Sequence, residues 1–311
     1  MFEKAFRDFG IHFNTLNEKN TFSSGDLVTG HIAFVIPKAT KIRSIAMCLT
    51  GNVDVHWTSG GGKRKRTYHA KMDFFRLKST ILEEGAVGSA SQLPPGRHVY
   101  PFTCQIPQGD FPSSFRGPHG QICYKLTVSI DRPWHMSKDF VTELNFVHRV
   151  DCNRPELTAP LSGSNCTSVC SLSCTSGSIT MTASVEKKGF VQGETIRIVC
   201  NFSNGSSRTV IPKAKLKQKQ QYNTPKGVRG RLFVKKLDSV TGPPVAAHTF
   251  DAQTEMTLTI PDDSSLTITN CNLLQVEYEI ELSLCLRASS DLTVLFPIVV
   301  CDIPLHPRYP D

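Results

Sequence analysis

The chain carries one pattern twice, as Phe22-Ser23-Ser24-Gly25-Asp26-Leu27-Val28 and again as Phe190-Val191-Gln192-Gly193-Glu194-Thr195-Ile196. Each copy is followed by a second shared block. In this block an Ile-Pro pair leads to a tyrosine after the same interval, from Pro107 to Tyr124 and from Pro261 to Tyr278. A shared turn followed by a shared interval favours two copies of one domain over a chance likeness between β-rich sequences.

The stretches around this repeat have the period of strands. After the first tyrosine, apolar residues alternate at Leu126, Val128 and Ile130, as in a half-buried strand. No long segment has the apolar spacing of an amphipathic helix. Short runs of this kind, separated by Gly, Pro and Asn turns, predict an all-β chain with a β-sandwich in each half. Gly51 interrupts one such run and predicts a kink or bulge there.

The length and composition agree with two domains and suggest where they meet. A chain of 311 residues is long enough for about two domains. Its middle is rich in Ser, Thr, Gly and Cys, which is typical of a linker. We therefore expect a first domain over 1–150, a linker over 151–178, a second domain over 179–303 and the stub of a tail over 304–311.

Charge and cysteine usage indicate a compartment and a type of partner. The net charge is +8, and residues 1–150 hold 19 basic against 12 acidic residues. This excess favours acidic partners for the first half. The 11 cysteines include several at apolar strand positions, the first seven residues show no apolar segment of a secretory signal, and no apolar run is long enough to span a membrane. We therefore expect a reducing, cytoplasmic setting without a disulfide framework.

The repeated block and its surroundings resemble the arrestin superfamily, and most closely the arrestin-domain-containing proteins called α-arrestins. The stretches that carry the resemblance are 24–30 and 112–120 in the first half and 186–194, 204–208 and 271–278 in the second. It implies two tandem arrestin-like, immunoglobulin-type β-sandwiches acting as an adaptor. Such adaptors bind cytoplasmic tails of membrane receptors or transporters and bring Nedd4-type ubiquitin ligases to them. They act in endocytosis and protein transport, at the plasma membrane and endosomes.

One motif departs from the family. The Pro-Pro-x-Tyr motif that binds ligase WW domains does not occur in these 311 residues, and the nearest match is His306-Pro307-Arg308-Tyr309. Pro307 and Tyr309 keep two of the three residues that the motif specifies, but the missing first proline loosens the polyproline II conformation that WW domains recognise. The alternative function is a competitor that binds cargo without recruiting a ligase.

A lysine-rich stretch is the first candidate binding surface. Strand periodicity places four of its lysines on one face, where they form a positive rail for acidic or phosphorylated tails or for anionic lipid. The alternative is a solvated strand face whose lysines discourage edge pairing. The four are Lys213, Lys215, Lys217 and Lys219.

A glycine-rich hairpin tip is the second candidate. Three glycines, 60–62, precede four cations, so the tip should be exposed. In position it resembles the loop with which arrestins contact receptors, and its charge suits an anionic membrane at about 1 kcal/mol per residue. A purely solvated loop and a peripheral lipid-binding scaffold are the alternatives. By resemblance, Lys4 and Arg7 fall where arrestins contact phosphate. The tip residues are Lys63, Arg64, Lys65 and Arg66.

The sequence gives little reason to expect catalysis, a cofactor, a metal or nucleic acid. Its ten histidines are scattered, and no nucleophile elbow, phosphate-binding loop or zinc-protease motif occurs. The spacing Cys166-x3-Cys170-x3-Cys174 does not match the usual zinc pairs, and lipidation of these thiols is an alternative. The basic stretches lack the interleaved aromatic residues of nucleic-acid-binding strands. We expect a protein that is not an enzyme.

Overall fold

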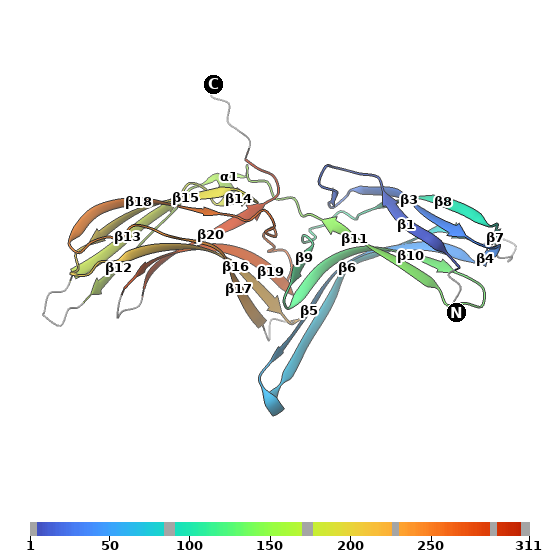
Figure 1. The fold of residues 1–311 in the computed structure, drawn as a ribbon, viewed down its shortest axis with the longest axis horizontal. Helices are drawn as coiled ribbons and strands as arrows, with labels where there is room; N and C mark the ends of the chain where they lie inside the picture. Colours follow the sequence, from blue (N-terminus) through green and yellow to red (C-terminus); the bar gives the residue numbers. More distant parts are fainter. Residues whose placement is uncertain (1–4, 84–90, 170–176, 226–229, 287–290, 306–311) are drawn as a thin grey trace, which may run out of the picture. The chain divides into compact units, whose positions relative to one another are not determined.

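Strands make up nearly all of the regular structure (Figure 1). The structure is a computed structural model, and it describes residues 5–83, 91–169, 177–225, 230–286 and 291–305. Two compact units divide the chain, the first made mainly of Met1–His148 and the second mainly of the residues from Arg149 onward. Each unit contains two sheets whose inward-facing side chains form its core.

The first unit pairs a three-stranded sheet with a larger one. The small sheet has the order β1-β3-β8 and the large sheet β2-β11-β10-β5-β6, with β9 beside β10 and a separate β4-β7 pair. A single 3-10 turn, η1 (Gly62–Arg64), joins β5 to β6. The strands are β1 (Arg7–Phe13), β2 (Thr21–Phe22), β3 (Leu27–Ile36), β4 (Thr40–Ile42), β5 (Ser44–Ser59), β6 (Arg66–Glu83), β7 (Ser91–Leu93), β8 (Gly96–Gln105), β9 (Phe115–Gly117), β10 (Gly120–Asp131) and β11 (Lys138–Phe146).

The second unit repeats this plan. Its sheets have the orders β12-β13-β15-β18 and β14-β20-β19-β16-β17. The short helix α1 (Pro155–Thr158) precedes them. The strands are β12 (Leu161–Val169), β13 (Gly177–Val185), β14 (Gly189–Val191), β15 (Thr195–Asn204), β16 (Ile211–Asn223), β17 (Gly230–Thr241), β18 (Thr249–Thr259), β19 (Leu274–Cys285) and β20 (Leu292–Cys301).

The repeated turn has the same geometry in both units. Gly25 and Gly193 adopt φ values of 80° and 79°, a backbone conformation that residues other than glycine rarely adopt. In each turn the following acidic residue accepts a hydrogen bond from the backbone N–H three residues earlier, at 2.7 Å for Asp26 and 2.9 Å for Glu194. The pattern Gly-Asp/Glu is therefore repeated because the glycine makes the turn and the carboxylate closes it.

The repeated tyrosine lies at the centre of each large sheet. Tyr124 on β10 and Tyr278 on β19 are both buried, and each hydroxyl donates a hydrogen bond to a backbone carbonyl earlier in the chain. Their cross-strand neighbours differ, because Tyr124 faces Gly51 whereas Tyr278 faces Gln218. A register shift follows Gly51, so the predicted bulge is confirmed. Both copies thus keep the buried tyrosine ring, but a glycine faces it in the first unit and a glutamine faces it in the second.

The segment expected to be a linker differs from expectation. Residues 151–178 include α1 and the whole of β12, which pairs with β13 from Leu161 opposite Val185 to Val169 opposite Gly177. The strand was hard to recognise because its residues are small and polar, so they show no apolar alternation. It is an edge strand, where backbone hydrogen bonds on one side suffice. The domain limits given above stay a prediction.

The described cysteines are all unpaired thiols, and those expected at apolar positions face inward or lie half-buried. Cys123 and Cys200 are buried, and Cys48 and Cys285 are intermediate in exposure. Burial raises the pKa of the Cys200 thiol to about 12, because the thiolate would lose its hydration. Such thiols act as small apolar residues of the core.

Candidate partner-binding surfaces

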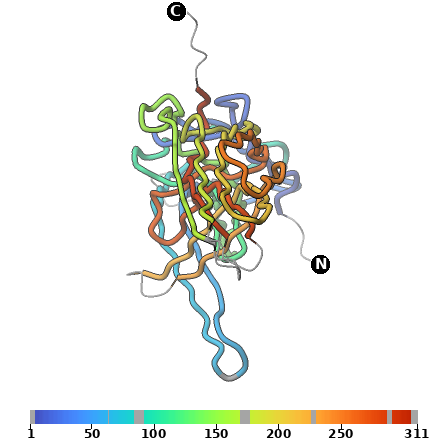
Figure 2. Tube along the Cα trace, turned by 90° about the vertical axis from the view of Figure 1, so that its left-hand side faces the viewer, coloured from blue at the N-terminus to red at the C-terminus, as the bar shows by residue number. Residues whose placement is uncertain are grey.

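The hairpin of β5 and β6 extends well beyond the other strands of its own unit (Figure 2). Strand β6 is 18 residues long and is the last strand in the order of the large sheet. Most of its side chains are exposed. An edge strand of this length presents a row of backbone N–H and C=O groups to which an extended peptide can pair.

The charge of this edge is mainly positive. Four exposed cations of β6 stand against two carboxylates, and the tip adds two more exposed cations, Arg64 and Lys65. One carboxylate, Asp73, lies 3.8 Å from Arg76, but both groups are about half exposed, so water screens the pair. The structure does not describe the side chain of Lys63. The four cations of β6 are Arg66, Lys71, Arg76 and Lys78.

The base of the tip is held by stacked rings. Trp57 on β5 is 3% exposed and stacks on Tyr68 of β6 with a centroid distance of 5.3 Å. Beyond this pair, Gly60 has φ 83°, and a Cβ atom there would lie 2.6 Å from the backbone oxygen of Arg64. The turn therefore requires glycine at this position. The cations are carried by a defined turn on a packed base.

The lysine-rich stretch forms β16, in the middle of its sheet. Strands β17 and β19 pair with its two edges, so its lysines cannot serve to discourage edge pairing. Two carboxylates of β19 form ion pairs with three of its four lysines. Lys215 binds Glu281 at 2.9 Å, Lys217 binds the other oxygen of the same carboxylate, and Lys219 binds Glu279 at 2.6 Å.

The sequence contained a signal for this pairing. Glu277, Glu279 and Glu281 alternate in the second repeated block, so they share a face of β19. The antiparallel register places Glu277 opposite Lys219, Glu279 opposite Lys217 and Glu281 opposite Lys215. The positive rail stays a prediction as an anion-binding surface, and it is weakened because most of its charge is already paired.

Replacing Glu281 by glutamine should reduce the acid sensitivity of the second unit. Burial raises the pKa of Glu281, but hydrogen bonds from Lys217 and Lys215 lower it by more, so the net shift is downward. A lowered carboxyl pKa stabilises the fold above the unfolded value of about 4.3, and this contribution is lost as the pH falls through the folded pKa. We expect E281Q to cost roughly 1–2 kcal/mol at pH 7, and the cost should shrink as the pH falls below the unfolded pKa.

Urea unfolding measured at several pH values checks this prediction. The matched control is E255Q, which removes an exposed ion pair with Arg197 in the same unit and should cost less than about 0.5 kcal/mol. An E281Q curve parallel to that of the unchanged chain from pH 7 to pH 3 would contradict the expected linkage.

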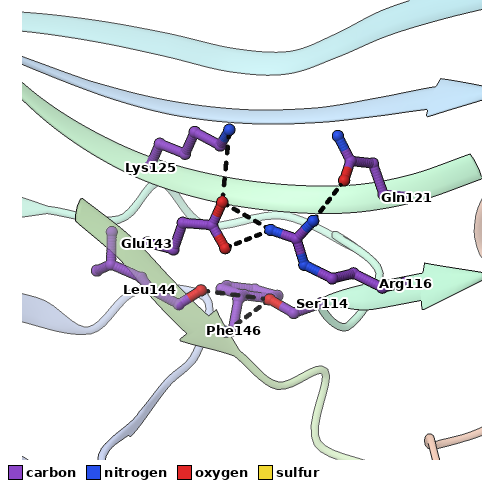
Figure 3. Close-up of polar contacts among 7 residues, drawn as sticks. All are labelled: Ser114, Arg116, Gln121, Lys125, Glu143, Leu144 and Phe146. Carbon is purple, nitrogen blue, oxygen red and sulfur yellow. Dashed lines mark hydrogen bonds and ion pairs between the residues drawn. The ribbon is translucent and has the colours of Figure 1, made fainter. Parts of the chain in front are cut away.

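An arginine of β9 ties together two neighbouring strands (Figure 3). Arg116 donates to both carboxylate oxygens of Glu143 on β11, at 2.7 and 2.6 Å, and to the side-chain oxygen of Gln121 at 2.7 Å. Lys125 approaches the same carboxylate at 3.5 Å. The hydrogen bond from Arg116 is the main reason why the pKa of Glu143 is lowered. Arg116 lay within the stretch 112–120 that carries the resemblance, but nothing marked it as a site.

Two open pockets adjoin this arginine. One has a volume of about 320 Å³ and is lined by Tyr124 and Leu144 among others, and the second, of about 350 Å³, is lined by His56 and His119. Because Glu143 binds one guanidinium nitrogen of Arg116 and Gln121 binds the other, the arrangement acts as a clamp between β9 and β11. A pocket ligand that bound the guanidinium would have to compete with these side chains.

The structure places the remaining predicted residues as follows. Arg7 begins β1, is exposed and faces Val35 of β3. Lys4, Pro307 and Tyr309 lie outside the described residues, as do Cys170 and Cys174. Cys166 is exposed on β12. Among the residues that the structure describes, no group of three His, Cys, Asp or Glu side chains is arranged to hold a metal ion.

The described part of the chain also contains no helix with the length and apolar character needed to cross a membrane.

Comparison with known families agrees with the geometry of both units. Residues 9–153 match the model "Arrestin (or S-antigen), N-terminal domain", and residues 175–305 match "Arrestin (or S-antigen), C-terminal domain". The chain therefore belongs to the arrestin family, and the two tandem β-sandwiches predicted from the sequence are confirmed. Neither matched model describes an enzyme family.

Similarity to individual proteins indicates which branch of the arrestin family the chain resembles. The chain is 27% identical over 302 residues to thioredoxin-interacting protein of Mus musculus, covering 96% of this chain and 74% of that protein. It is 26% identical over 301 residues to the Homo sapiens protein of the same name, covering 96% and 75%. These relatives are α-arrestins, so the predicted likeness to that branch is confirmed.

Proposed function

We propose that this chain is an α-arrestin-type adaptor that binds cytoplasmic parts of membrane receptors or transporters and takes part in their endocytosis and transport. One observation carries the choice of surface: the long, exposed edge of β6, whose cations continue into the tip at Arg64 and Lys65. Extended segments add to such an edge through backbone hydrogen bonds, whatever their sequence. The basic side chains then favour acidic segments over neutral ones.

The second part of the proposal concerns the ligase. Adaptors of this branch are expected to recruit Nedd4-type ubiquitin ligases, and Pro307 with Tyr309 is the nearest match to the motif that those ligases bind. The function places the protein in the cytoplasm with peripheral association at the plasma membrane and endosomes. Support for this part is the family membership alone.

A panel of immobilised cytoplasmic tails tests the adaptor function. We expect acidic or phosphorylated tails to retain the chain, scrambled neutral tails to retain it weakly, and retention to fall with added salt because the contacts are exposed. Equally weak retention by all tails would contradict the proposal. WW domains of a Nedd4-type ligase form the second arm. Retention by tails but not by WW domains would favour the competitor that binds cargo without a ligase.

A further inference from the structure

The turn between β10 and β11 exposes two large apolar side chains. Trp134 is 99% exposed and Met136 is 92% exposed, more than any other large apolar residue in the described part of the chain. The other of the two tryptophans, Trp57, is 3% exposed. Keeping an indole and a thioether in water forgoes the stabilisation that burial would give. Their exposure together on one turn therefore suggests a partner surface.

The turn is held in this conformation. Trp134 has φ 61°, which is unusual for a bulky residue. Backbone N–H of His135 donates to the carbonyl of Arg132 at 3.3 Å, and the His135 ring lies 2.8 Å from the carbonyl oxygen of Pro133. Backbone conformations of this kind persist where the surroundings hold them, and they concentrate at functional sites.

The base of the turn is packed. Phe140, which follows it on β11, stacks on Phe9 with a centroid distance of 3.5 Å. The guanidinium of Arg132 lies 5.4 Å from the centre of the Phe6 ring, and the ammonium of Lys138 lies 5.0 Å from that of Phe140. The apolar tip therefore projects from a rigid, aromatic support with cations on both sides.

Cations predominate around the turn. Asp131 at its base is paired with Arg43 at 3.0 Å, and Asp139 accepts a hydrogen bond from Ser129. Strands β5 and β10 meet here, because Ser44 faces Asp131 in the sheet and the backbone N–H of Arg43 donates to the Asp131 carbonyl. Ser44 also faces Glu83 of β6, and Arg7 of β1 and Arg97 of β8 both face Val35 at one end of the small sheet. With Lys41, two residues before Arg43, these cations outnumber the carboxylates.

We propose that this turn, residues 131–138, docks the first unit on an anionic bilayer surface, with Trp134 and Met136 in the interfacial layer and the bordering cations near lipid phosphates. Tryptophan concentrates at the headgroup level, where its ring is apolar and its N–H finds acceptors. Basic residues near the surface add to binding. The tip of a hairpin is convex, so it suits a fluid surface better than a bound peptide. This contact uses none of the β6 edge, and it is independent of the proposed function.

The two tryptophans make the test direct. In the Trp57→Phe variant Trp134 is the sole tryptophan, and we expect its emission to shift to shorter wavelength with phosphatidylcholine vesicles containing phosphatidylserine, and to be quenched by brominated lipid. Sedimentation with the same vesicles should fall about tenfold or more in a Trp134→Ser/Met136→Ser variant, because both apolar contacts are lost. Lys41→Gln should lower it about fivefold.

Controls separate this contact from others. Phe250→Ser removes a side chain that is 64% exposed in the second unit, and it should leave sedimentation unchanged. Circular dichroism should show that every variant keeps the fold, because Trp57→Phe keeps an aromatic ring at the buried position and the other substituted side chains are exposed.

Several results would overturn the proposal. One is the absence of an emission shift and of sedimentation with the anionic vesicles. A second is equal binding to vesicles of phosphatidylcholine alone. A third is an emission shift that appears when the protein is concentrated in the absence of vesicles. Unchanged sedimentation of the Trp134→Ser/Met136→Ser variant, together with its loss on neutralising Arg64 and Lys65, would place the membrane contact on the β5–β6 hairpin instead.

Discussion

Replacing Tyr278 by alanine is expected to lower the free energy of unfolding of the second unit by about 4 kcal/mol. The ring is 1% exposed at the centre of β19, so its removal leaves a cavity that the surrounding strands cannot fill. Its hydroxyl also accepts a hydrogen bond from Gln218 at 2.7 Å, and Gln218 in turn accepts one from Gln220 at 2.6 Å. Alanine therefore removes both packing and the end of a buried hydrogen-bonded chain.

The Tyr278→Phe variant separates these two contributions. It keeps the ring and removes the hydroxyl, so we expect a loss of about 1–2 kcal/mol, because the Gln218 amide loses one of its two acceptors and the Ser265 carbonyl loses its donor. Urea unfolding followed by circular dichroism gives the energies, and hydrogen exchange should show the loss of protection in β16 and β19. Equal losses for phenylalanine and alanine would mean that packing of the ring contributes nothing.

Replacing Gly51 by valine is expected to cost about 3 kcal/mol or more in the first unit. A Cβ atom at Gly51 would lie 2.6 Å from the Tyr124 ring and 3.0 Å from the Phe75 ring. Both rings are packed, so neither can move without disturbing the core around β10. Unfolding followed by the fluorescence of Trp57, which lies on the same strand, measures the loss.

The matched control for this substitution lies in the same hairpin. A Cβ atom at Gly61 meets nothing within 4 Å, so Gly61→Val should change the stability by less than about 0.5 kcal/mol. Comparable losses at the two glycines would show that the cost at Gly51 does not come from the clash with the Tyr124 and Phe75 rings.

The repeated elements could be read from the sequence because their chemistry is local. A glycine with positive φ followed by a closing carboxylate marks the turn at Gly25 and Gly193, and strict alternation marks the strands around both tyrosines. The bulge at Gly51 was predictable for the same reason. Strand β12 was not, because Ser, Thr and Asn side chains give no alternation and only the pairing with β13 reveals it.

The binding surfaces were harder to predict because they depend on neighbours far away in the sequence. The lysines of β16 looked like an open positive surface until β19 brought Glu279 and Glu281 against them. In contrast, the proposed binding role of the tip cations gains support from the edge position of β6, which composition alone could not show. Nothing in the sequence marks Trp134 as exposed, and only the fold shows that nothing in the described structure covers it.

The most direct test of the adaptor account is the affinity of a fluorescent acidic segment, taken from a retained tail, for two matched variants. One carries glutamine at Arg64, Lys65 and Arg66 of the β5–β6 hairpin. The other carries glutamine at the exposed cations of β17, the corresponding edge strand of the second unit, which are Arg231, Lys235 and Lys236.

We predict that the hairpin variant binds about tenfold or more weakly, because up to about 1 kcal/mol is lost per exposed charge contact, and that the β17 variant stays within about twofold. Equal weakening in both variants, or none in the hairpin variant, would contradict the assignment of partner binding to the β6 edge and its tip.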